Sequence, residues 1–85
     1  MQYETMIRLK NIVIENNVAK CDIFPENSIE NGTIEIDLAQ NDITSAVLPK
    51  GYEWCKMHLE HTKNYLSELY KSKFKIPDEK IIMWY

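Results

Sequence analysis

The residues of this chain that could do chemistry gather in one stretch, Cys55-x-x-His58-x-x-His61. Thiolate and imidazole groups bind zinc and also carry nucleophilic catalysis. On a helix, however, Cys55 and His61 lie roughly 120° apart around the axis, so one ion does not easily take both. A pair of these residues could supply two ligands if a neighbouring element supplied more. We therefore keep a small-ligand or metal-binding role, possibly with catalysis, as the alternative function for Cys55, His58 and His61.

Cys55 is also a poor candidate for a nucleophile. It falls on the apolar stripe of a predicted helix, and burial raises the pKa of a thiol and makes it unreactive. The other cysteine, Cys21, lies in a predicted strand, so both are expected to be reduced core residues. With two glycines in the chain, there is no glycine-rich loop to hold a phosphate. These features favour a protein that is not an enzyme, and we expect no cofactor and no metal.

An aromatic ribbon lies beside the predicted apolar stripe and consists of Trp54, His58, His61 and Tyr65. On a helix these four residues fall within roughly 60° of one another around the axis. Their side chains have an apolar body and a polar tip, which suits a partly hydrated contact with a partner. The other interpretation is that the ribbon is the margin of the helix, closing over the terminal strand.

The composition limits the classes of partner. The 85 residues suffice for one domain, 1–85, with a single core. The formal net charge is −3, with acids and bases interspersed, which argues against nucleic acid and anionic membranes as partners. No apolar run approaches the ~20 residues that span a bilayer, and the N-terminus lacks a signal-peptide core, so we expect a cytoplasmic protein. A single arginine, Arg8, among ten basic residues is typical of an AT-rich bacterial or phage genome.

The first half of the chain has the alternation of β-strands. Alternating apolar and polar residues predict strands at 7–14, 18–24 and 33–38, and less clearly at 43–48. In the first strand the apolar phase shifts by one near Asn11, which either a β-bulge or burial of both faces would explain. Residues typical of turns separate the strands, at Asn16-Asn17, Asn31-Gly32 and Gln40-Asn41-Asp42.

The second half predicts one long helix and a last strand. From Tyr52 to Ser72 there is no Pro or Gly, and apolar residues recur at helical spacing. The final KIIMWY is apolar enough to need a place inside the fold. Four up-and-down strands and a helix that returns across the sheet leave this terminal strand antiparallel to the first strand and beside it. The prediction is an α+β fold: an antiparallel sheet of four or five strands, order 5-1-2-3-4, with one long helix on one face and element order β-β-β-β-α-β.

The sheet face opposite the helix is predicted to be an association surface. Apolar side chains point to both faces of the terminal strand, and Val13 likewise opposes Ile12 and Ile14, so one helix cannot cover them all. Monomers rarely leave such patches bare. We expect a homodimer or a protein partner, with the contact centred on Val13 and the terminal strand. The anchor is Trp84 or Met83, depending on which face the helix takes. Protein association by a small non-enzymatic domain is the predicted function.

Overall fold

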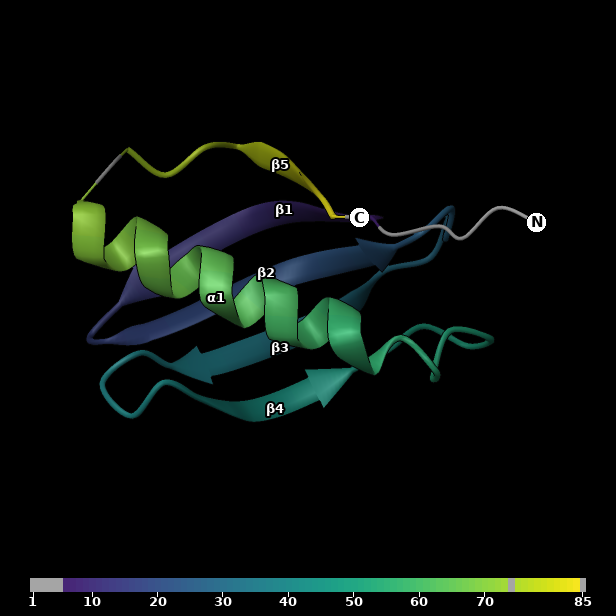
Figure 1. Cartoon of the computed structure of the whole chain (residues 1–85), viewed down its shortest axis with the longest axis horizontal. Coiled ribbons are helices and arrows are strands. Elements are labelled where there is room, and N and C mark those ends of the chain that lie inside the picture. Colours follow the sequence, from purple (N-terminus) through teal and green to yellow (C-terminus); the bar gives the residue numbers. More distant parts are fainter. Residues whose placement is uncertain (1–5, 74, 85) are drawn as a thin grey trace.

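Five antiparallel strands and one helix make up the computed structural model, which describes residues 6–73 and 75–84 (Figure 1). The elements are β1 (Met6–Glu15), β2 (Val18–Pro25), β3 (Gly32–Asp37), β4 (Asp42–Val47), α1 (Lys56–Ser72) and β5 (Glu79–Met83). The sheet order is β4-β3-β2-β1-β5, and α1 runs obliquely across one face of the sheet. The predicted α+β class, element order and strand order are confirmed.

The irregularity predicted in the first strand is a β-bulge. The register of β1 against β2 shifts at this point, and Asn11 has a left-handed φ of 56°. The extra residue reverses the side-chain phase, so Ile7 and Leu9 before the bulge and Ile12 after it are all buried. The same reversal turns Val13 to the face that α1 leaves uncovered. Of the two explanations for the shifted phase, the bulge is the right one.

Asparagines shape two of the connections between strands. Asn16 and Asn17 have φ values of 51° and 65° in the turn from β1 to β2, and Asn41 has a φ of 57° before β4. Asparagine tolerates this left-handed region better than most residues with a Cβ atom. Tight turns keep successive strands adjacent, and this makes β1 to β4 a simple meander.

Two details of α1 differ from the prediction. The helix begins at Lys56 rather than near Tyr52, because Gly51 has a φ of 88° and the next residues form turns. In these turns the N–H groups of Tyr52 and Cys55 donate to carbonyls three residues earlier, at 2.9 and 3.0 Å. The helical spacing of the apolar residues places Ser67 on the solvent face of the predicted helix. In the structure Ser67 is buried and donates to Asn41 Oδ1 at 2.6 Å, because the β3–β4 turn reaches this side of the helix.

The core lies between α1 and the sheet. The buried side of the helix is the predicted stripe, and it includes Leu59, Thr62, Leu66 and Leu69. It covers the buried strand residues, among them Ile7, Leu9, Ile23, Ile34 and Ile36. Within the described residues, no helix has the length and apolar character needed to cross a membrane.

The last strand completes the sheet at the free side of β1. β5 pairs with β1 in antiparallel register from Glu79 to Met83. Ile82 and Trp84 pack against the core on the helix side, whereas Ile81 and Met83 are exposed. The helix therefore takes the Trp84 face, which leaves Met83 on the uncovered face. Tyr85 lies outside the described residues.

Candidate functional site

The aromatic ribbon lies over the end of the chain, against Trp84. The Trp84 ring stacks on His61 with centroids 4.0 Å apart, and it meets His58 edge-on at 4.9 Å. Trp54 precedes α1 and contacts the other side of His58, edge-on at 5.6 Å. Tyr65 packs against the core, and burial raises the pKa of its phenol. These contacts hold the helix margin against β5 and leave Trp54 as the most exposed member of the ribbon.

His58 has a buried acidic partner, Glu26, which sequence reasoning missed. His58 Nε2 contacts Glu26 Oε2, and the two residues are only 4% and 2% exposed. Glu26 follows β2 directly and has a φ of 57°. Its backbone N–H donates to the Met6 carbonyl at 3.0 Å, and its Oε2 accepts from the Met6 N–H at 3.2 Å. The pair thus ties the start of β1 and the end of β2 to the first turn of α1.

No local signal identified Glu26. It lies 32 residues from His58, in a stretch that has the composition of an ordinary loop. Within the described part of the chain, Glu26 Oε1 and His58 Nδ1 have no hydrogen-bond partner. A buried polar group costs free energy unless it has a partner. Glu26 is this partner for His58 inside the fold.

Both cysteines are free and buried, as predicted. Burial raises the pKa of Cys21 to about 12, and the neighbouring Asp22 adds to the shift. Burial also raises the pKa of Cys55 to about 11, with a further contribution from the Glu26 carboxylate. Thiols in this state are almost entirely protonated at neutral pH, which makes them poor nucleophiles and poor metal ligands.

The side chains of Cys55, His58 and His61 do not converge on a common site. Across residues 6–73 and 75–84, no three His, Cys, Asp or Glu side chains are grouped so that they could hold a metal ion. His58 faces Glu26, and His61 stacks on Trp84. His58 and His61 therefore each pack against a different partner, and Cys55 is buried in the core.

The uncovered face of the sheet carries the other predicted contact residues. Val13, Ile81 and Met83 are 47%, 49% and 59% exposed on this face. Val47, on the edge strand β4, is also exposed and was not predicted as a contact residue. Exposed apolar side chains therefore occur at both edges of the face as well as near its middle.

Basic side chains separate these apolar positions. Arg8 and Lys10, neighbours on β1, extend over the Phe24 ring of β2, with Arg8 Cζ and Lys10 Nζ at 5.0 and 5.4 Å from its centroid. Their aliphatic stems cover part of the ring, and the cations gain from its π face. This half of the face thus combines the Phe24 ring with two basic side chains, and Glu79 of β5, the cross-strand partner of Lys10, adds an acidic group beside them.

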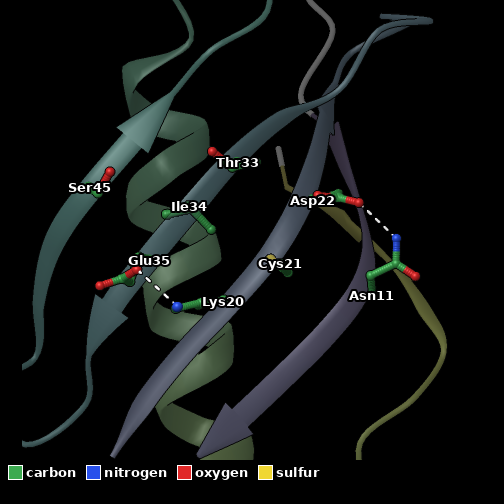
Figure 2. A pocket seen from close by; sticks show the side chains of 8 residues that line it. All are labelled: Asn11, Lys20, Cys21, Asp22, Thr33, Ile34, Glu35 and Ser45. Atoms are coloured by element: carbon green, nitrogen blue, oxygen red, sulfur yellow. Dashed lines mark hydrogen bonds and ion pairs between the residues drawn. The ribbon is translucent and has the colours of Figure 1, made fainter.

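The middle of the face is a shallow polar hollow of about 330 Å³ (Figure 2). Lys20 Nζ lies 3.6 Å from Glu35 Oε1 on one side of it. On the other side, Asn11 Nδ2 donates to Asp22 Oδ2 at 2.7 Å. In this view α1 lies behind the sheet, so the hollow opens on the uncovered side. It presents paired charges of both signs, and its lining also includes Thr33, Ser45 and the buried Cys21, whose raised pKa makes it a poor nucleophile.

Comparisons with models of protein families, with curated proteins and with solved structures found no match to this chain. The chain has a sheet face of mixed apolar and charged side chains, and inside the fold it has the buried Glu26–His58 pair. The sheet face is exposed to solvent, and the pair links the end of β2 to the first turn of α1.

Proposed function

We propose that this protein acts by self-association, as a homodimer that buries the sheet face opposite α1. Met83 is the anchor, and Val13 lies near the centre of the contact. The exposure of Ile81 and Met83 carries the proposal, because both project from an edge strand onto a face that no helix or strand of residues 6–73 and 75–84 covers. Large exposed apolar side chains gathered on one face are typical of protein contacts.

The available area is sufficient for such a contact. An ordinary specific interface takes about 800 Å² from each partner. The accessible surface of the chain is 5787 Å², so this is about one seventh of it, which one face of a two-layer molecule can supply. Two sheets stacked face to face lie about 10 Å apart, a spacing that side chains such as Met83 and Val13 fill.

The aromatic ribbon is not part of the proposed contact. His58, His61 and Tyr65 are already packed against Glu26, Trp84 and the core. Trp54 is exposed, but it lies on the helix side of the sheet. The dimer proposal therefore concerns the uncovered face alone.

Sedimentation of the purified chain at micromolar concentration tests the proposal. We expect a species of twice the chain's mass, and we expect Met83→Lys to convert it to monomer. Met57→Lys is the matched control, because Met57 is 65% exposed but lies on α1, on the other side of the molecule. A wild-type chain that stays monomeric at this concentration contradicts self-association and leaves a foreign protein as the partner for this face. Equal effects of the two substitutions contradict the choice of face.

A further inference from the structure

Opposite charges occupy neighbouring strands on the uncovered face. Lys10 of β1 and Asp22 of β2 are cross-strand partners in the sheet register. In the next row, Val13 of β1 is the cross-strand partner of Lys20 of β2. Because side chains alternate between the two faces of a strand, these rows share the face that carries Arg8 and Phe24.

We infer that the second copy stacks with its strands alongside those of the first, about a two-fold axis that runs parallel to the strands above the seam between β1 and β2. The inference rests on the proposed function and specifies its partner arrangement. Such an axis sets β1 of one copy on β2 of the other. Each cross-strand pair then faces the same pair with its members exchanged.

The charge pattern favours this axis over its neighbours. With the axis above the seam, Lys10 faces Asp22 of the second copy, and Asp22 faces Lys10, so four charges alternate in sign. An axis above β1 would set Lys10 on Lys10, and one above β2 would set Asp22 on Asp22. Like charges facing each other across an interface are strongly unfavourable, so both of these arrangements are disfavoured.

The seam axis also accommodates the apolar and aromatic residues. Arg8 faces the Phe24 ring of the second copy, repeating the cation–π contact that it makes within its own chain. Val13 faces the aliphatic stem of Lys20. β5 is set against the start of β3 and the connection before it, which carries the exposed Ile29.

An axis running across the strands, between Lys20 and Asp22, also brings opposite charges together. In that arrangement β5 of one copy lies in line with β5 of the other, in the reverse direction. β5 begins at Glu79, in the row of Lys10, and runs away from such an axis. The two β5 strands would therefore not overlap, and Ile81 and Met83 would face no strand of the second copy. The seam axis leaves Val47 of the edge strand β4 without a facing strand, whereas the crosswise axis leaves Ile81 and Met83 of β5 without one.

Charge exchange between Lys10 and Asp22 tests the arrangement. At low salt we expect Lys10→Glu and Asp22→Lys, each alone, to raise the dimer dissociation constant by more than about tenfold, because each sets like charges face to face. An equimolar mixture of the two variants should form a heterodimer with nearly the wild-type constant. The chain carrying both substitutions should dimerise in the same way, and its thermal melt checks that the exchanged pair still folds.

Lys20→Glu is the control, because Lys20 faces Val13 in the proposed arrangement, and its effect should be less than about threefold. If Lys20→Glu is as damaging as Asp22→Lys, the axis runs across the strands and the inference is wrong. If the wild type dimerises but the mixture of Lys10→Glu and Asp22→Lys does not regain nearly the wild-type dissociation constant, the proposed axis is wrong and self-association stands. A wild-type chain that stays monomeric overturns both the proposed self-association and the proposed axis.

Discussion

The buried Glu26–His58 pair predicts a large loss of stability for one substitution, Glu26→Ala. The change leaves His58, which is 4% exposed, without its partner. Breaking a buried ion pair costs about 3–5 kcal/mol, and leaving a neutral buried polar group unpaired costs about 1–3 kcal/mol. We expect a loss of about 3 kcal/mol, where the two ranges meet. For a small domain with a free energy of unfolding near the lower end of about 5–15 kcal/mol, this is roughly half.

Urea denaturation followed by circular dichroism measures this loss, and a thermal melt should fall by about 12–24 °C. Glu30→Ala is the matched control, because Glu30 lies in the same connection and is exposed. His58→Ala and the double variant complete a thermodynamic cycle. Because the two residues are in contact, we expect the double variant to lose at least about 1 kcal/mol less than the sum of the single losses.

Two results would refute this reasoning. In one, Glu26→Ala unfolds within about 0.5 kcal/mol of the Glu30→Ala control, which is the usual range for surface changes. In the other, the losses for Glu26→Ala and His58→Ala simply add, which would mean that the two side chains stabilise the fold independently.

Two further predictions concern the terminal strand and the thiols. A chain truncated after Lys80 loses the partly buried Ile82 and Trp84 from the core margin, worth about 3 kcal/mol, together with the pairing of β5. It should not melt cooperatively near the full-length temperature, and a melt within about 5 °C of the full chain contradicts the packing of this strand. Cys21 and Cys55 should react with a thiol reagent at neutral pH only after unfolding, and fast labelling of the native chain contradicts their burial. Because folding raises the pKa of these thiols from 9.0 to about 12 and about 11, the unfolded chain loses their protons first. The free energy of unfolding should therefore fall above about pH 9, by up to about 1.4 kcal/mol per pH unit for each thiol, and a flat profile to pH 11 contradicts the shift.

Several features followed from the sequence alone because they depend on residues close together in the chain. Alternation of apolar and charged residues marks β2 and β3, and the helical spacing of Leu59, Leu66 and Leu69 marks the buried side of α1. The strand order also followed, because a meander and one returning helix fix the direction of β5, and of the two free edges of the meander only the β1 edge then gives antiparallel pairing. The sequence also indicated that one helix cannot cover all the apolar side chains of β1 and β5, and it named Val13, with either Met83 or Trp84, as the excess.

Other features depend on contacts between residues far apart in the chain, and these only the tertiary structure decided. Which face α1 covers was open, because both faces of β5 are apolar, and the packing of Trp84 against His58 and His61 settles it. The burial of Ser67 depends on a turn 26 residues away. Glu26 has no periodic or compositional mark, and its role arises because the end of β2 meets the first turn of α1. A local pattern records which side of an element is apolar, but only the assembled layers determine which distant group that side contacts.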